Sequence, residues 1–131
     1  MLSVVIPTLD AAADLAPTLA ALVPESAGGE IVVADGGSAE ATASIAAAAG
    51  ARVIQAPRGR GAQLRAGAEA ARGDWLLFLH ADTRPAPGWR EAAARFMADP
   101  ANAGRAAAFR FALDDGDPRA RRLDRGVAWR G

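Results

Sequence analysis

Short apolar runs alternate with helical patterns along most of the chain. Residues 2–6, 30–34 and 75–79 form short, mainly apolar runs, and residues 52–55 form a shorter segment of the same type. Such runs are typical of strands that are buried on both faces of a parallel sheet. The segments between them place apolar side chains at helical spacing. This order predicts an α/β fold with an open, mainly parallel sheet flanked by helices.

Polar residues and glycines indicate where the expected helices begin and end. Asp10 or Asp14 is a candidate cap for the first helix, and Ser38 is a candidate cap for the second. Gly50 stands where a left-handed residue commonly follows a helix. The glycine-rich loop at residues 57–61 is expected to open the third helix.

The pattern of the last third of the chain is different. A fourth helix is expected to present Trp89 and Phe96 to the core. Residues 107–113 place apolar side chains at alternate positions, which predicts a strand at an edge or in an antiparallel pair. A turn at residues 114–118 and a helix from Arg119 are expected to follow.

Composition excludes several classes of site. The 131 residues carry 15 basic and 15 acidic side chains, so bulk charge gives no support to nucleic-acid binding. The absence of cysteine excludes disulfides and thiolate metal sites, and a single histidine excludes a histidine-rich site. A metal ion would therefore be held mainly by oxygen, which favours Mg²⁺ or Mn²⁺.

The sequence gives no sign of export or of a membrane span. The first residues lack the basic region of a signal peptide, and no apolar stretch approaches the roughly 20 residues of a membrane span. We therefore expect a cytoplasmic protein, with a peripheral position at the inner face of the membrane as an open alternative.

Polar residues follow each of the four predicted strands. In open parallel sheets, ligands bind outside the carboxyl ends of the strands. The four segments at these ends are Pro7-Thr8-Leu9-Asp10, Asp35-Gly36-Gly37-Ser38, Arg58-Gly59-Arg60-Gly61 and His80-Ala81-Asp82-Thr83. We expect all four to gather at one edge of the sheet and to form a binding site.

The loop after the third strand is a candidate anion site. Gly59 and Gly61 allow the backbone to approach a ligand, and the start of a helix offers free N–H groups and a positive dipole end. Arg58, Arg60 and Arg65 add guanidinium charge suited to phosphate. An ordinary loop with solvated arginines is the alternative.

The two strand ends with acidic residues are candidates for cation and nucleoside binding. Asp82 ends a very apolar strand, where a carboxylate must be solvated, paired or bound to a cation; capping of the next helix is the alternative. His80 lies two residues earlier and is either a second metal ligand or a structural histidine. Asp35 is either an acceptor for a base or ribose, or a turn residue favoured by the following glycine.

Several of these segments, in this order, resemble family-2 glycosyltransferases of the GT-A fold. SVVIPTLD resembles the opening strand and Pro-Thr-x-Asn pattern of that family, with Asp10 in place of the usual Asn. VVADGGS resembles its Val-Asp-Asp-Gly-Ser segment, and Asp35 falls on the first Asp. GRGAQLRAGAEAARGDWLLFLHADT resembles the stretch that leads to its Asp-x-Asp motif. The similarity covers about residues 3–98.

The resemblance implies a GT-A (Rossmann-like) fold that transfers a sugar, with inversion, from a nucleoside-diphosphate sugar of UDP or GDP type to an unspecified acceptor. It also implies a divalent cation, Mg²⁺ or Mn²⁺. His80 replaces the first Asp of the motif, Arg65 stands where Asn is common, and His-Ala-Asp resembles a bacterial subgroup. The residues implied are Pro7, Thr8, Asp35, Arg60, Gly61 and Gln63 for the nucleotide, and Asp82 with His80 for the metal.

The general base of this family comes from a later acidic segment, which would be expected well after residue 113. The acidic residues at 114, 115 and 117 come too early for that role. We therefore expect a C-terminally truncated fold that binds a sugar nucleotide and is inactive or only partly active. We expect a single domain, residues 1–131, with a donor-binding core over about 1–98 and the start of an incomplete acceptor-side part over 105–131.

Two other functions fit parts of the pattern. A sugar-nucleotide-binding module without catalysis would use the same strand ends. A nucleotidyltransferase would use the basic glycine-rich loop formed by Gly59, Arg60 and Gly61, although that class usually places such a loop after its first strand. An incomplete domain is also expected to expose apolar surface and to self-associate.

Overall fold

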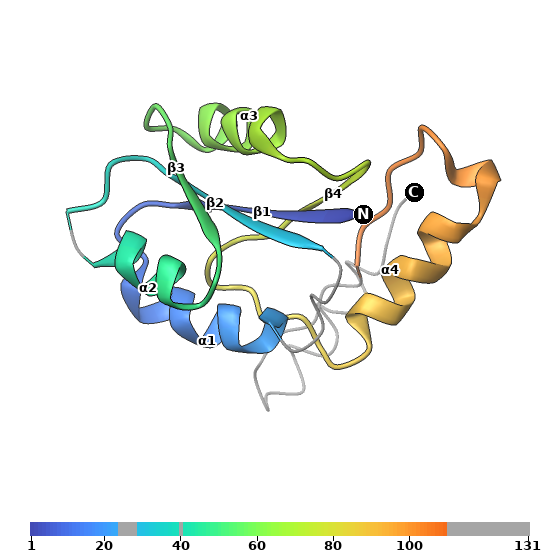
Figure 1. Ribbon diagram of the computed structural model, residues 1–131, viewed down its shortest axis with the longest axis horizontal. Coiled ribbons are helices and arrows are strands. Elements are labelled where there is room, and N and C mark those ends of the chain that lie inside the picture. The colour runs from blue at the N-terminus through green and yellow to red at the C-terminus, as the bar shows by residue number, and fades with distance from the viewer. Residues whose placement is uncertain (24–28, 40, 110–131) are drawn as a thin grey trace, which may run out of the picture. The chain divides into compact units, whose positions relative to one another are not determined.

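The computed structural model describes residues 1–23, 29–39 and 41–109 (Figure 1). The chain divides into two compact units, residues 1–95 and 96–131. The strands are β1 (Leu2–Thr8), β2 (Glu30–Asp35), β3 (Arg52–Gln55) and β4 (Trp75–Phe78). The helices are α1 (Ala12–Leu22), α2 (Thr42–Ala48), α3 (Arg60–Ala70) and α4 (Trp89–Ala98), and a short 3₁₀ helix, η2, spans Pro100–Asn102.

The four strands form one parallel sheet with β1 at its centre. Their order is β3-β2-β1-β4, and each neighbouring pair is parallel. Val5 of β1 lies opposite Val32 of β2 on one side and Phe78 of β4 on the other. Val5 and Val32 are fully buried, as expected for apolar runs in the interior of a parallel sheet. The predicted parallel α/β fold is confirmed.

Helices cover both faces of this sheet. Figure 1 shows α1 and α2 on one face and α3 on the other. Leu15, Leu19 and Leu22 of α1 are buried, which is the apolar stripe that packs an amphipathic helix against a core. On the other face, Gly67 brings α3 close to β1, because a Cβ added there would lie 2.3 Å from Val5 Cγ1.

The predicted caps of the first two helices are wrong. The N-cap residues of α1 and α2 are alanines without a capping side chain, and Asp14 lies in the first turn of α1. Asp10 Oδ1 instead accepts a hydrogen bond from Ala39 N at 2.8 Å, while Asp10 N donates to Ser38 Oγ at 3.0 Å. Asp10 and Ser38 therefore join the loops after β1 and β2 instead of capping the helices beside them.

The prediction that the strand at residues 75–79 is buried on both faces is also wrong. Among the described residues, β4 pairs only with β1 and forms an edge of the sheet. Leu76 and Phe78 are 39% and 49% exposed. An apolar run indicates a strand, but its pairing partners decide how much of it is buried.

Several other expectations have clear outcomes. Gly50 has a left-handed φ of 83°, as predicted. Trp89 is buried, whereas Phe96 is only half-buried.

Residues 107–109 form no regular element, and the remainder of the strand predicted at 107–113, with the turn and helix predicted after it, lies outside the described residues. None of the described helices has the length and apolar character needed to cross a membrane.

Candidate functional site

A cleft of about 400 Å³ lies at the carboxyl edge of the sheet. Three of the four predicted segments line it: residues 7–11 at and after the end of β1, residues 58–60 before and at the start of α3, and residues 80–82 after β4. Asp14 and Gln63 complete the lining from α1 and α3. The structure therefore brings together Pro7, Thr8, Arg60, Gln63, His80 and Asp82, whereas Asp35 and Gly61 do not line the cleft.

The wall formed by the start of α3 carries positive charge. Gly59 has a φ of 131° and immediately precedes the helix, so its conformation favours glycine at this point. The first N–H groups of a helix lack intrahelical acceptors and can bind an anion. Arg58 and Arg60 are exposed on either side of Gly59, and neither has a polar partner among the described residues. This wall can therefore hold a phosphate group.

Arg65 lies outside this positive wall. Its Nε is 2.9 Å from Glu69 Oε1, one turn further along α3, and its side chain is 80% exposed. Gly61 lies in the first turn of α3 and also does not line the cleft. The charge available to a ligand here thus comes from Arg58 and Arg60.

The opposite wall carries the expected metal ligands. His80 and Asp82 follow β4, are exposed and line the same cleft. The loop is fixed by Thr83 N, which donates to His80 O at 3.0 Å, and by Thr18 Oγ1, which donates to Ala81 O at 2.6 Å. Asp82 does not cap α4, because that helix begins seven residues later, at Trp89. Sequence reasoning missed Thr18, which lies in the middle of a helix 63 residues away.

This pair of side chains fits a divalent cation only in part. One imidazole and one carboxylate are donors that Mn²⁺ and Mg²⁺ accept, although oxygen is preferred. No group of three or more acidic or histidine side chains that could hold a metal ion occurs among the described residues. His80 and Asp82 would therefore share the cation with oxygen atoms of a ligand, as a diphosphate provides.

Asp35 lies behind the cleft and organises its own turn. It is 3% exposed, and its carboxylate accepts hydrogen bonds from Thr8 Oγ1 at 3.0 Å and from Ser38 N at 3.0 Å. Ser38 Oγ and Gly37 N also donate to it. Burial alone would raise the pKa of Asp35, but the hydrogen bonds from Ser38, Thr8 and Gly37 outweigh it and hold the pKa below its ordinary value. A contact between Asp35 and a nucleoside stays a prediction.

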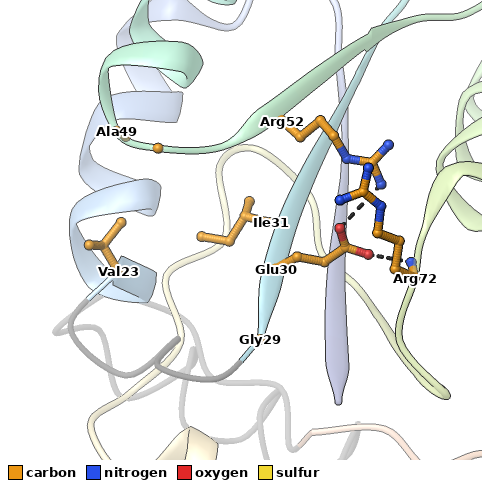
Figure 2. A pocket seen from close by; sticks show the side chains of 8 residues that line it. Val23, Gly29, Glu30, Ile31, Ala49, Arg52 and Arg72 are labelled. Carbon is orange, nitrogen blue, oxygen red and sulfur yellow. Dashed lines mark hydrogen bonds and ion pairs between the residues drawn. The ribbon is translucent and has the colours of Figure 1, made fainter.

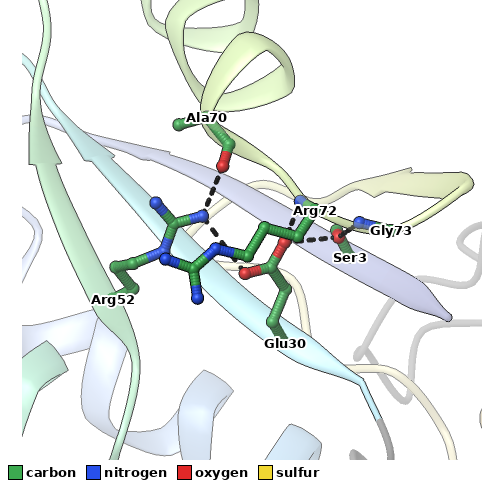
Figure 3. Close-up of polar contacts among 6 residues, drawn as sticks. All are labelled: Ser3, Glu30, Arg52, Ala70, Arg72 and Gly73. Carbon is green, nitrogen blue, oxygen red and sulfur yellow. Dashed lines mark hydrogen bonds and ion pairs between the residues drawn. The ribbon is translucent and has the colours of Figure 1, made fainter.

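A second cavity, of about 280 Å³, lies at the amino edge of the sheet (Figure 2). Figure 3 shows its polar contacts: Glu30 accepts hydrogen bonds from Ser3 Oγ at 2.7 Å, from Arg52 at 3.1 Å and from Arg72 N. Arg52 also donates to Ala70 O at the end of α3, and Gly73 N donates to Ser3 Oγ at 2.8 Å. We call these residues, Ser3, Glu30, Arg52, Arg72 and Gly73, the amino-edge clasp.

The amino-edge clasp is a structural feature, and its cavity is a poor anion site. The ends of α1 and α2, at Val23 and Ala49, line the cavity, and helix C-termini carry partial negative charge. The carboxylate of Glu30 lies in it as well. The Arg52 guanidinium therefore pairs with a carboxylate of the protein itself, and the cleft at the carboxyl edge is the candidate functional site.

Comparisons with known proteins identify the family of the chain and support its fold. The family model described as glycosyl transferase family 2 matches residues 3–129. Among solved structures, S. aureus TarS (residues 1–349) has a TM-score of 0.66 and 23% identity, covering 73% of this chain and 32% of that chain, and supports the fold. The search of curated protein sequences found no significant match.

A second solved relative is closer in sequence. Glucosyl-3-phosphoglycerate synthase from Mycobacterium tuberculosis in complex with uridine diphosphate has a TM-score of 0.61 and 30% identity, covering 67% of this chain and 36% of that chain. Its complex with Mn²⁺, uridine diphosphate and glucosyl-3-phosphoglycerate has a TM-score of 0.59 and 28% identity, covering 65% of this chain and 36% of that chain. The chain thus spans about a third of the length of these structures. With its parallel sheet, its cleft and a family match over almost its whole length, the chain belongs to glycosyl transferase family 2.

Proposed function

We propose that the carboxyl-edge cleft binds the diphosphate of a sugar nucleotide between its two polar walls. The observation that carries this proposal is that Arg58, Gly59 and Arg60, at the start of α3, line the same cleft as His80 and Asp82. Cationic and metal-binding groups that share one cleft suit a ligand with several negative charges. Structures of the mycobacterial relative in complex with uridine diphosphate and Mn²⁺ or Mg²⁺ support a nucleoside diphosphate and a divalent cation as the class of ligand.

The reaction we propose is transfer of the sugar with inversion. The acceptor hydroxyl forms a bond to the anomeric carbon, and the bond from that carbon to the diphosphate oxygen breaks, with its electrons leaving on the diphosphate. Arg58 and Arg60 stabilise the charge that develops on the departing diphosphate. A cation held by His80 and Asp82 would supply Lewis-acid stabilisation of the same group. The acceptor proton passes to a base that we do not assign to any described residue.

The test is calorimetric titration of the protein with uridine diphosphate and guanosine diphosphate, each with and without Mn²⁺. We expect diphosphate binding that strengthens with Mn²⁺ and an Asp82→Ala variant that loses about tenfold or more of the Mn²⁺-dependent affinity. Asp74→Ala is the matched control, since Asp74 is an exposed acid near the N-terminal amino group, outside the cleft. Equal Mn²⁺-dependent affinities for the wild type and Asp82→Ala would contradict the proposed metal site.

A turnover assay separates transfer from binding alone. Release of nucleoside diphosphate from the matching sugar nucleotide, abolished in Asp82→Ala, supports catalysis by this chain. Mn²⁺-dependent binding without any release would instead support a module that binds the donor without catalysis.

A further inference from the structure

Gln63 has its whole amide group engaged inside the protein. The side chain is 4% exposed and lies in the second turn of α3. Its Nε2 donates to Thr8 O at 2.8 Å and to Ala34 O at 3.0 Å, and its Oε1 accepts from Gly59 N at 3.2 Å. A primary amide has two N–H donors, so both are already used.

The three partners of Gln63 come from three segments at the carboxyl edge of the sheet: the end of β1, the end of β2 and the loop before α3. Thr8 ends β1 and lines the cleft, and Ala34 is the penultimate residue of β2, next to the Asp35 turn. Gly59 precedes α3 and lies between the two cleft arginines. Gly36 also packs against this amide, since a Cβ added to Gly36 would lie 2.9 Å from Gln63 Cδ. One side chain therefore sets the spacing between the ends of two strands and the arginine loop.

Other side chains cannot reproduce these contacts. Glutamate would place a carboxylate oxygen against the carbonyl groups of Thr8 and Ala34, where two donors are needed. Asparagine keeps the amide but is shorter by one methylene. Methionine matches the length of Gln63 and leaves the Gly59 N–H without its acceptor.

We propose that Gln63 is a positioning residue for diphosphate binding, and that it acts by holding the Gly59 N–H and the adjacent Arg60 against the ends of β1 and β2. This inference rests on the proposed function, because it assigns the positive wall to a diphosphate. It also means that the nucleotide is bound by Arg58, Arg60 and free N–H groups of α3, while Gln63 acts through them.

The first test needs no ligand. Hydrogen exchange is measured by NMR at the Gly59 amide in the wild type and in Gln63→Met. The Gly59 N–H has no other acceptor among the described residues, so we expect its exchange to accelerate about fivefold or more in the variant. Gly67→Ala is the control, because it loosens α3 from Val5 without touching the amide of Gln63. Unchanged Gly59 exchange in Gln63→Met overturns the proposal.

The second test is a double-mutant cycle on uridine diphosphate affinity in the presence of Mn²⁺. Arg60→Met should weaken binding in the wild-type background and have an effect at least about threefold smaller in the Gln63→Met background. Equal effects in the two backgrounds overturn the proposal, since a purely structural role would leave the contribution of Arg60 intact. In the Gly67→Ala background, Arg60→Met should keep its full effect.

The failures of the two proposals can be told apart. If the wild type binds no nucleoside diphosphate, the proposed function is wrong, and Gly59 exchange alone judges the role of Gln63. If Gln63→Met does not fold, the same two measurements are made on Gln63→Asn, whose shortened amide cannot reach all three partners.

Discussion

The polar side chains around the cleft are of two kinds. Asp35 and Gln63 are buried and bind other parts of the protein, whereas Arg58, Arg60 and Asp82 are exposed. Buried polar groups need partners within the protein, so the first kind fixes the loops. The exposed groups keep their charge available for a ligand. Substitutions of the buried residues should therefore lower the stability of the fold, and substitutions of the exposed residues should lower the affinity for a ligand.

Thr18 is predicted to support the metal-binding loop. Its hydroxyl donates to Ala81 O between His80 and Asp82, and the side chain is fully buried. Thr18→Val should therefore weaken Mn²⁺-dependent binding of uridine diphosphate about fivefold, which corresponds to the loss of one hydrogen bond. Thr18→Ser keeps the hydroxyl and should retain the affinity. The measurement is calorimetric titration, and the same Mn²⁺-dependent affinity for both variants would refute the prediction.

At the scale of elements, the contact between α3 and β1 depends on a glycine. Gly67→Ala would place a Cβ 2.3 Å from Val5 Cγ1 and should lower the free energy of unfolding by about 1–3 kcal/mol. Gly61, in the same helix, has no atom within 4 Å of an added Cβ, so Gly61→Ala should leave stability unchanged or raise it by up to about 1 kcal/mol. Urea unfolding of both variants checks the pair. An equal loss of unfolding free energy in both variants would show that the substitution of a helical glycine, and not the contact with Val5, causes the loss.

The amino-edge clasp makes stability depend on pH. Burial alone would raise the pKa of Glu30, but hydrogen bonds from Arg72 N, Ser3 and Arg52, with the charge of Arg52, hold it below its ordinary value. The contribution of Glu30 is therefore present at neutral pH and is lost as the pH falls below about 4, through the lowered pKa. Glu30→Gln should cost about 1 kcal/mol or more at pH 7 and should make the loss in acid shallower.

Thermal unfolding between pH 3 and pH 7 checks the role of Glu30. Glu69→Gln is the control, because the ion pair between Glu69 and Arg65 is exposed and contributes little. Some acid sensitivity should persist in Glu30→Gln, since the pKa of Asp35 is lowered as well. A Glu30→Gln variant whose acid transition is as steep as that of the wild type would rule out the clasp as its source.

The elements that could be predicted from the sequence are those with a local pattern. Apolar runs located all four strands, and a glycine located the end of α2. The roles of Asp10 and Ser38 could not be predicted, because their partners lie 28 or 29 residues away. The roles of Gln63 and Thr18 were hidden for the same reason, since each acts through a backbone carbonyl of a distant segment. Residue type and spacing located the walls of the cleft. They did not show which polar side chains are hydrogen-bonded within the protein and which are available to a ligand.

At the scale of the whole molecule, self-association stays a prediction, and the exposed apolar residues of β4 are where we place it. Leu76 and Phe78 lie two residues apart on an edge strand, where an apolar surface favours pairing with another chain. We predict concentration-dependent association by sedimentation velocity, and its loss when both residues are replaced by threonine. Val23→Thr is the control, because Val23 is exposed to a similar degree, 42%, at the end of α1. A wild-type protein that stays monomeric over the whole concentration range would disprove this.

The end of β1 lines the cleft, and β1 pairs with two other strands of the sheet. Pro7 and Thr8 line the cleft and end the strand on which both β2 and β4 depend for pairing. A ligand that binds only the folded chain stabilises it by mass action, by about 2.7 kcal/mol at one hundred times its dissociation constant. The rise in melting temperature with each of a panel of sugar nucleotides would thus rank candidate donors before any acceptor is known.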